Sequence, residues 1–385
     1  MNFIPVVIKG SSRHAAAIKP ALFTFFSGAG FLDLGFERSG FEVVFVNEFH
    51  APFLNAYKYS REKLGIGRPM FGYLQDDIGA LLTKSESGSL AANVQRARCS
   101  HGLVGFIGGP PCPDFSVGGK NRGRDGENGK LSQTYVDLIC EQKPDFFVFE
   151  NVKGLWRTKV HRAFYEELKA KLRLAGYSLS DRLINAIEYG APQDRDRIIL
   201  VGFLQNSFPR MPTDLEETFR WNSSTIFDRS VLKESFWPDR EPFSKNSKRV
   251  LPSEIPLELT VQHWFDLNEV LTHPNAKDCF VPRAALPKFK IIDEGDDSKK
   301  CFKRLHRWRY SPTAAYGNNE VHLHPYEARR ISVAEALAIQ SLPKGYCLPP
   351  EMTLTDKFKT IGNGVPFKAA QGIAVGVSDF LGGWI

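Results

Sequence analysis

The chain has 385 residues, 42% of them hydrophobic and 24% charged, which predicts a folded protein with a sizeable core and more than one domain. No apolar run reaches the roughly 18 residues of a membrane span. The first twenty residues carry no secretory signal, so we expect a cytoplasmic protein with no membrane partner. The formal net charge of +7 fits a polyanionic partner without identifying one.

The six cysteines, at positions 99, 112, 140, 279, 301 and 347, are far apart and form no CxxC pair. This spacing argues against a structural zinc site and against a disulfide framework. We therefore expect reduced thiols, most of which serve in packing, and no bound metal.

Short apolar runs alternate with amphipathic stretches in the first half of the chain. The candidate strands are residues 22–26, 42–48, 103–109, 145–151 and 197–203, and a helix is predicted over 161–176. Strands that are apolar throughout and separated by helices indicate a mainly parallel sheet with helices on both faces. Ligands of such α/β sheets bind at the carboxyl ends of the strands.

Glycine usage separates a middle segment from the rest of the chain. Residues 205–325 contain two glycines but 11 of the 24 prolines, so we interpret them as a smaller domain inserted into an α/β domain formed by 1–204 and 326–385. After the insertion, 329–343 predicts a helix with a capping box of Ser332 and Glu335. A glycine turn within 360–380 then opens onto a helix that we expect to dock back onto the first domain.

The segment FFSGAGFLDLGFERSG (25–40) follows the first predicted strand and opens a helix. Gly28 and Gly30 permit a tight turn and close backbone approach by a ligand, but Asp33 stands where a dinucleotide fingerprint has its third glycine. Glu48, twenty residues beyond Gly28, is placed to bind ribose hydroxyls. This pattern favours a nucleoside cofactor without a pyrophosphate, S-adenosylmethionine.

Reactive side chains follow other predicted strands. Cys112 comes after a Pro-Pro step in GFIGGPPCPDFSVGG (105–119), where a strand end exposes a thiol that can act as a nucleophile. Glu150 ends an apolar strand, and partial burial would raise its pKa so that it can donate a proton near neutral pH. Asp77 is a candidate to bind an adenine amino group, with Asp76 as a competitor.

Basic residues accompany these groups. Arg195 and Arg197 in QDRDRI are two residues apart, so their side chains share one side of an extended chain. Two guanidinium groups that face a crevice suit a base carbonyl oxygen or a phosphate. The loop 117–130 holds five glycines and four basic residues, which predicts a mobile lid that attracts phosphate.

These segments, in this order, resemble the cytosine-5 DNA methyltransferase family. The motifs that carry the resemblance are FFSGAGFLDLGF, GGPPCPDFS, FVFENVKGL, QDRDRIILVGF, RRISVAEALAIQSLP and TIGNGV. The resemblance implies a Rossmann-like S-adenosylmethionine-dependent methyltransferase fold, with 205–325 in the place of that family's target-recognition domain. Two positions depart from the family pattern, because Pro113 replaces the usual glutamine and Gly364 replaces a frequent serine.

The resemblance further implies methylation at C5 of a flipped-out cytosine within a specific double-stranded DNA sequence. Cys112 would add to cytosine C6 while Glu150 assists at N3. Arg197, with Arg195 nearby, would hold the cytosine O2 or a flanking phosphate, and Asn151 and Gln193 would support the site. The residues implied to bind the cofactor are Phe26, Ser27, Gly28, Ala29, Gly30, Phe31, Glu48, Phe49, Asp77, Ile78, Pro111, Leu131, Asn363 and Val365.

DNA would be bound by the lid and by the inserted domain. In KKCFKRLHRWRY (299–310), six Lys or Arg alternate with Phe302, Trp308 and Tyr310, a mixture suited to phosphate and groove contact. The candidate DNA-binding residues are Lys120, Arg122, Arg124, Gln193, Arg304, Arg307 and Arg309.

Three alternative functions stay open. The first is a relative that methylates cytosine in RNA, and the second is a dinucleotide-dependent oxidoreductase, which Asp33 disfavours. The third is a catalytically silent DNA-binding protein on the same scaffold, against which the presence of Cys112 and Glu150 counts. The compact chain fits a prokaryotic modification enzyme of a restriction-modification system, with a cognate restriction endonuclease that acts separately.

Overall fold

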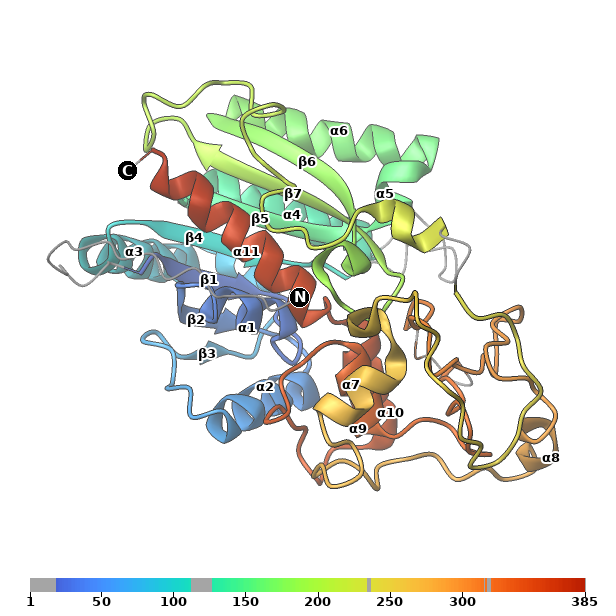
Figure 1. Cartoon of the computed structure of the whole chain (residues 1–385). Coiled ribbons are helices and arrows are strands. Elements are labelled where there is room, and N and C mark those ends of the chain that lie inside the picture. The colour runs from blue at the N-terminus through green and yellow to red at the C-terminus, as the bar shows by residue number, and fades with distance from the viewer. Residues whose placement is uncertain (1–18, 112–126, 234–236, 315, 317–319, 385) are drawn as a thin grey trace, which may run out of the picture.

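The computed structural model of the chain describes residues 19–111, 127–233, 237–314, 316 and 320–384. Its centre is a seven-stranded sheet in the order β3-β2-β1-β4-β5-β7-β6 (Figure 1). The strands are β1 (Ala21–Phe25), β2 (Glu42–Asn47), β3 (Tyr73–Leu74), β4 (Val104–Gly108), β5 (Phe146–Val152), β6 (Tyr177–Asn185) and β7 (Asp196–Leu204). Neighbouring strands are parallel from β3 to β5, and β7 runs antiparallel to both β5 and β6. The predicted mainly parallel α/β fold is confirmed.

Helices cover both faces of the sheet, as Figure 1 shows. The helices of this part are α1 (Phe31–Glu37), α2 (Ala51–Lys63), α3 (Lys84–His101), α4 (Glu127–Gln142), α5 (Lys153–Arg157), α6 (Lys159–Leu174) and α11 (Phe367–Gly382), with short 3-10 helices at η1 (Ile78–Leu82) and η3 (Ala186–Tyr189). One apolar cluster joins the sheet to α1, α2 and α11, and a second joins it to α3, α4 and α6. None of the helices within the described residues is long and apolar enough to cross a membrane.

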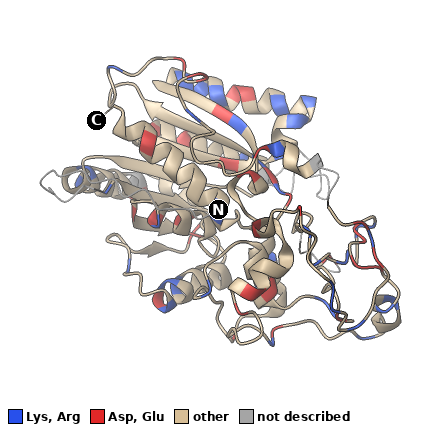
Figure 2. Cartoon of the chain, viewed as in Figure 1, with Lys and Arg blue, Asp and Glu red and all other residues tan. Residues whose placement is uncertain are grey.

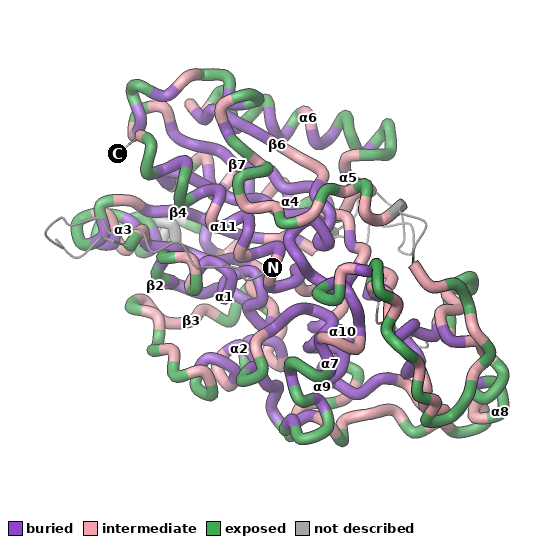
Figure 3. The backbone as a smooth tube through the Cα atoms, viewed as in Figure 1, coloured by how far each residue is buried: buried purple, intermediate pink, exposed green. Residues whose placement is uncertain are grey.

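The central strands are apolar throughout because side chains alternate between these two clusters. In β1, Leu22 belongs to the cluster on the α11 side, whereas Phe23 and Phe25 belong to the cluster on the α4 side. Figure 3 shows this buried centre. The sequence pattern did not predict β3 or β6. β3 has only two residues, and β6 lies at the edge of the sheet, pairs with β7 alone and contains the polar stretch SDR (180–182).

The C-terminal segment returns to the first part of the chain. It contains α9 (Val333–Ile339), α10 (Leu354–Asn363) and α11. The predicted capping box is confirmed, since the Ser332 hydroxyl accepts from the Glu335 amide at 3.2 Å and the Glu335 carboxylate accepts from the Ser332 amide at 2.7 Å. The helix ends at Ile339, earlier than predicted. α11 packs so closely on α1 that a Cβ at Gly35 would lie 2.5 Å from the Cβ of Ala370, which confirms the predicted docking.

Residues 205–325 carry little regular structure in their described part. The elements there are η4 (Arg229–Lys233), η5 (Leu257–Leu259), α7 (Val261–Leu267) and α8 (Leu286–Phe289). The first residues, including Phe208 and Phe219, pack with β7 and α11, whereas Trp264 and Leu305 pack with α1 and α9. The segment is thus anchored at two places, and its division from the α/β domain at residue 205 stays a prediction.

Cross-strand pairs of glycine and phenylalanine tighten the sheet and can be tested. Gly202 lies opposite Phe147, and a Cβ at Gly202 would lie 2.1 Å from Cε1 of that ring. We expect Gly202→Ala to lower the free energy of unfolding by about 1–3 kcal/mol, because overpacking forces the ring from its rotamer. Urea unfolding measures this. The control is Gly88→Ala in α3, where a Cβ meets nothing within 4 Å; an equal loss there would contradict the steric explanation.

Candidate active site

Near the carboxyl ends of β4 and β5, the predicted catalytic residues Glu150 and Asn151 contact the chain that follows β4. The Glu150 carboxylate lies against the backbone after β4, because a Cβ at Gly109 would be 2.6 Å from Oε2 of Glu150. Asn151 Nδ2 donates to the carbonyl oxygen of Pro110 at 3.4 Å, so the chain that leads to the predicted nucleophile is tied to the end of β5. Cys112, and with it Lys120, Arg122 and Arg124, lies outside the described residues.

Glu150 is buried and paired with Arg197. It is 6% exposed, and its Oε1 accepts from Arg197 Nε at 2.8 Å. The two residues are diagonal neighbours in the antiparallel β5–β7 pair, where Glu150 faces Ile199 and Val152 faces Arg197. Burial raises the pKa of Glu150, and the charges of Arg197 and Arg195 act in the opposite direction. A carboxyl whose pKa is raised by burial keeps its proton to a higher pH than a solvated carboxyl, which suits a proton donor.

Arg195 does not face the crevice as we expected. It is 1% exposed, and its guanidinium donates to the carbonyl oxygens of Ala314 at 2.9 Å and Gly362 at 2.6 Å. Gln193 is also fully buried, and its Oε1 accepts from the Ala314 amide at 3.1 Å. The expected DNA contact of Gln193 and the expected substrate contact of Arg195 are therefore wrong for this conformation. Both side chains join the chain just before β7 to segments that are distant in the sequence.

The predicted cofactor residues meet at the ends of β1 and β2. Glu48, which is buried, accepts from the backbone amides of Gly28 and His50, each at 2.8 Å, and burial raises its pKa. A Cβ at Gly28 would meet nothing closer than the Thr360 hydroxyl at 3.9 Å, so the turn is open on that side. Phe49, directly after Glu48, is 68% exposed.

The remaining candidates lie around this turn in different degrees of exposure. Asp77 is exposed and caps η1, with Oδ1 accepting from the Gly79 amide at 2.7 Å. Ile78 and Val365 are buried, Leu131 and Pro111 are half-buried, and Asn363 is exposed. A Cβ at Gly364 would lie 2.2 Å from the ring of Phe31. This contact explains why glycine stands at 364 where the resemblance expects serine.

A group of residues that the sequence analysis missed forms the floor of the glycine turn. Arg61 is buried and donates to the carbonyl oxygens of Gly30 at 2.8 Å and Ala29 at 3.3 Å, and to Glu37 at 2.9 Å. The Tyr346 hydroxyl donates to the Ala29 carbonyl at 2.7 Å. The sequence did contain one indication of this group. Arg61 lies four residues after Tyr57, so both side chains share one face of α2, and a charged residue on a buried face needs partners.

The structure also corrects two predicted DNA contacts in 299–310. Arg304 is 1% exposed, and its guanidinium donates to the carbonyl oxygens of Ile292, His324, Glu327 and Phe289. Arg307 is 4% exposed and forms a bidentate pair with Glu294, with nitrogen–oxygen distances of 2.8 and 2.9 Å. Neither guanidinium is available to DNA. Arg309 remains partly exposed beside the ring of Tyr310.

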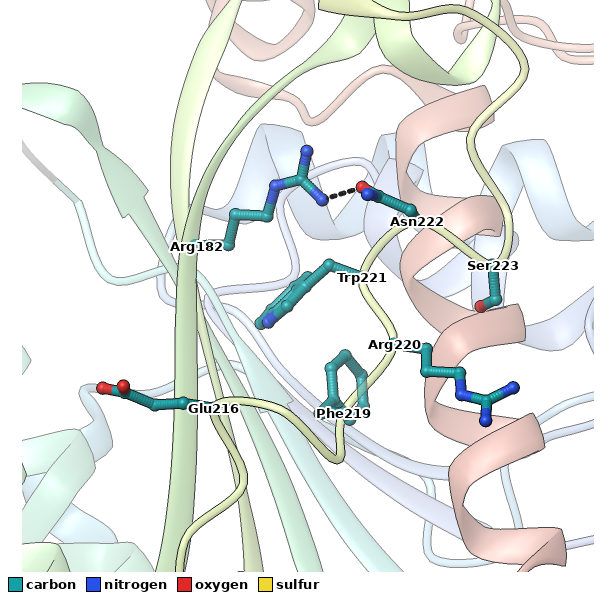
Figure 4. A pocket seen from close by; sticks show the side chains of 7 residues that line it. All are labelled: Arg182, Glu216, Phe219, Arg220, Trp221, Asn222 and Ser223. Atoms are coloured by element: carbon teal, nitrogen blue, oxygen red, sulfur yellow. Dashed lines mark hydrogen bonds between the residues drawn. The ribbon is translucent and has the colours of Figure 1, made fainter.

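Other features of the described residues do not add to this site. A cavity of about 470 Å³ lies between β6 and α11, as Figure 4 shows. It is lined by Arg182, Glu216, Phe219, Arg220, Trp221, Asn222 and Ser223 and contains none of the predicted site residues. No cluster of three His, Cys, Asp or Glu that would hold a metal occurs among the described residues. The five described cysteines form no disulfide.

The chain is similar to several known proteins. A family model described as C-5 cytosine-specific DNA methylase matches residues 85–378. Type II methyltransferase M.NmeDI of Neisseria meningitidis serogroup C is 58% identical over 363 residues, which cover 94% of this chain and 84% of that protein. Type II methyltransferase M.FnuDI of Fusobacterium nucleatum is 28% identical over 384 residues, 94% of each chain. A proposed DNA modification methyltransferase from an E. coli prophage shares the fold with a TM-score of 0.64 at 21% identity, over 94% of this chain and 100% of that one.

We expect the stability of the protein to depend on pH through Asp33, which is buried and interacts with the charge of Arg61. Burial raises the pKa of Asp33 from 3.8 to about 6, against the opposing charge of Arg61. The folded state binds this proton more tightly than the unfolded state, so Asp33 contributes stability that is present below about pH 4 and is lost as the pH rises through about 6. Asp33→Asn resembles the protonated form, and we expect it to match the wild type at pH 4 and to exceed it by about 1–3 kcal/mol at pH 8.

Urea unfolding at the two pH values measures this difference, and pH 4 serves as the internal control. A stability difference between Asp33→Asn and the wild type that does not change with pH would show that Asp33 has the same pKa in the folded and unfolded protein, and would contradict the effect of burial.

Because Arg307 is buried and paired with Glu294, we expect it to stabilise the fold and not to contact DNA. Hydrogen bonds from Arg307 hold the pKa of Glu294 below its usual value, although burial alone would raise it. We expect Arg307→Met to destabilise the protein by about 3 kcal/mol, the low end for a broken buried pair, because Arg249 still reaches Glu294 at 3.1 Å. Thermal unfolding measures the loss. Arg309→Met is the matched control, with an expected loss under about 1 kcal/mol; similar losses would refute the assignment.

Proposed function

Because this chain belongs to the C-5 cytosine-specific DNA methylase family, we propose that Cys112, Glu150 and Arg197 carry its reaction. The protein is a DNA cytosine-5-methyltransferase with S-adenosylmethionine as methyl donor. The observation that carries the proposal is the position of the Glu150 carboxylate, buried against Gly109 and paired with Arg197 at 2.8 Å. Gly109 precedes Cys112 by three residues.

Cytosine C5 is a poor nucleophile, and the side chains overcome this by addition at C6. The Cys112 thiolate forms a bond to C6 while the Glu150 carboxyl donates its proton, or a hydrogen bond, to N3. The electron pair of the C5–C6 double bond is thereby made available at C5. Bound S-adenosylmethionine supplies the methyl group that C5 takes up. Transfer of the C5 proton to solvent and return of the N3 proton to Glu150 then restore the C5–C6 double bond, as the sulfur–C6 bond breaks and Cys112 leaves as the thiolate.

Arg197 acts on Glu150 and on the base. Its Nε bond fixes one carboxylate oxygen, which leaves the other oxygen beside Gly109 for cytosine N3. The resemblance places the remaining guanidinium donors on the cytosine O2 or a flanking phosphate. The raised pKa of Glu150 supports a proton donor. The target base must leave the duplex, because its C6 atom is not accessible within the base stack.

The residues around the glycine turn fit S-adenosylmethionine. The buried Glu48 carboxylate at Gly28 suits ribose hydroxyls, and the open side of Gly28 leaves room for the ligand. The resemblance places Phe26 against adenine and Asp77 on the adenine amine, and the exposed ring of Phe49 would line the pocket. We propose that this set holds the cofactor: Phe26, Ser27, Gly28, Ala29, Gly30, Phe31, Glu48, Phe49, Asp77, Ile78, Pro111, Leu131, Asn363 and Val365.

The biological setting is part of the same proposal. Two relatives that cover 94% of this chain are Type II methyltransferases, which supports a modification enzyme of a restriction-modification system with a separately acting cognate endonuclease. Residues 205–325 would then form the target-recognition domain, and 1–204 with 326–385 the catalytic domain.

The test is methyl transfer from labelled S-adenosylmethionine to mixed-sequence duplex DNA and, in parallel, to RNA. We expect label in 5-methylcytosine of DNA, no label with Cys112→Ser, and a loss of about 10²–10⁴-fold in kcat with Glu150→Gln while cofactor binding is kept. Wild type should also form a covalent adduct with DNA that carries 5-fluorocytosine, because fluorine at C5 blocks the final elimination.

The matched thiol control is Cys99→Ser, which alters an exposed cysteine in α3 and should retain full activity. Label found only in RNA would show that the substrate is RNA and not DNA. Cofactor binding without label in either nucleic acid would leave a DNA-binding protein, and activity in Cys112→Ser would exclude this thiol as the nucleophile.

A further inference from the structure

A basic segment, defined here as residues 153–163, directly follows β5, the strand that carries Glu150. It contains Lys153, Arg157, Lys159 and Arg162, and no Asp or Glu. The segment forms α5 and the first turn of α6, and it begins three residues after Glu150. Several further Lys and Arg lie along α6 in Figure 2. The basic segment is therefore the part of α5 and α6 that is nearest to Glu150 in the sequence.

The backbone of this segment is fixed while its basic side chains reach outward. Leu155 is fully buried and Phe164, one residue beyond the segment, is 6% exposed, and both belong to the core cluster under α6. Arg157, Lys159 and Arg162 are exposed. A surface of this kind presents charge without the ordering cost of a flexible arm.

The charges of the segment are only partly neutralised by the protein. Lys153 pairs with Asp196 at 2.8 Å, and Asp196 also accepts from Arg229. Arg162 lies over the ring of Trp156 and reaches Glu166 at a nitrogen–oxygen distance of 3.7 Å. Arg157 and Lys159 form no ion pair with any described residue. These two cations of the segment can therefore pair with an anion of a ligand without breaking an ion pair to the described residues.

The segment also lies at the edge where the two parts of the chain meet. Asp196, the partner of Lys153, is the first residue of β7 and precedes Arg197. Just before it, the Asp194 amide donates to the Ser311 carbonyl at 2.9 Å, and residues 193 and 311 form an isolated β-bridge. Lys153 of the segment is thus joined through Asp196 to the residue that precedes Arg197, and long basic side chains in this position suit the phosphates that flank a base held at Glu150.

We propose that Arg157 and Lys159 bind the DNA backbone beside the target cytosine and form a sequence-independent contact surface on the catalytic part of the chain. The inference rests on duplex DNA as the substrate. It assigns to this surface the phosphate contact that Arg304 and Arg307 do not make, because their guanidinium groups are buried. Phosphate contacts of this type fix the register of a protein on the duplex without reading bases.

The test compares two double variants of the full-length protein. Arg157→Ser with Lys159→Ser removes the proposed contact, and Lys171→Ser with Arg173→Ser removes the same charge from exposed positions in the last turn of α6. Lys171 lies about 18 Å from Lys159 along the helix axis. Lys171 also pairs with Asp137, and the loss of such a surface pair costs less than about 1 kcal/mol, so the control variant should fold.

Binding to a mixed-sequence duplex is measured by fluorescence anisotropy over a series of salt concentrations, with S-adenosylhomocysteine present. Each phosphate contact contributes about 0.9 to the slope of log K against log salt. We therefore expect the first double variant to lower the magnitude of this slope by about 1.8, with unchanged thermal unfolding, a raised KM for DNA and an unchanged kcat. The control pair should keep the wild-type slope.

An unchanged slope in the first pair, or an equal change in both pairs, would overturn the proposal. Binding is measured without methyl transfer, so a failure of the Cys112 chemistry leaves this result readable.

Discussion

The ion pair between Glu150 and Arg197 depends on the reversal of one strand, and the proposed reaction depends on that pair. A carboxylate at 6% exposure is costly to desolvate unless it is paired or protonated. Because β7 runs antiparallel to β5, its first residues lie beside the last residues of β5. A parallel β7 would place its first residues at the opposite edge of the sheet, away from Glu150. The antiparallel strand therefore supplies the cation where the carboxyl is needed.

Buried arginines hold the parts of the chain that lack regular structure. Arg61, Arg195 and Arg304 are among the largest fully buried side chains of the described residues. Arg61 donates to carbonyls of the glycine turn, and Arg304 donates to the carbonyls of Ile292 and Glu327 in irregular segments. Arg195 donates to the Ala314 carbonyl and to Gly362 in the last turn of α10, where carbonyls have no partner within the helix. Carbonyl oxygens outside helices and sheets still need donors when they are buried. A planar group with five N–H donors can satisfy several of them at once.

This use of arginine changes what the basic composition means for DNA binding. A basic, aromatic-rich stretch such as 299–310 reads as a nucleic-acid surface when only its sequence is known. Two of its arginines instead bind partners inside the protein: Arg304 donates to backbone carbonyls, and Arg307 pairs with Glu294. The exposed cations that follow Glu150 in the chain belong to α5 and α6, whose sequence carries no aromatic-basic pattern of that strength. Exposure, which is a tertiary property, separates the two cases.

The sequence by itself determined the α/β fold, five of the seven strands, the capping box at Ser332, and the strand-end positions of Glu48 and Glu150. These follow from local pattern, because a strand buried on both faces must be apolar throughout and a polar residue at its end is then conspicuous. Only the tertiary structure decided that β7 is antiparallel, that Arg195, Gln193, Arg304 and Arg307 are buried, and that Arg61 and Tyr346 hold the glycine turn. Each of these depends on partners distant in the sequence, and no local pattern records whether a guanidinium meets solvent or a carbonyl from another segment.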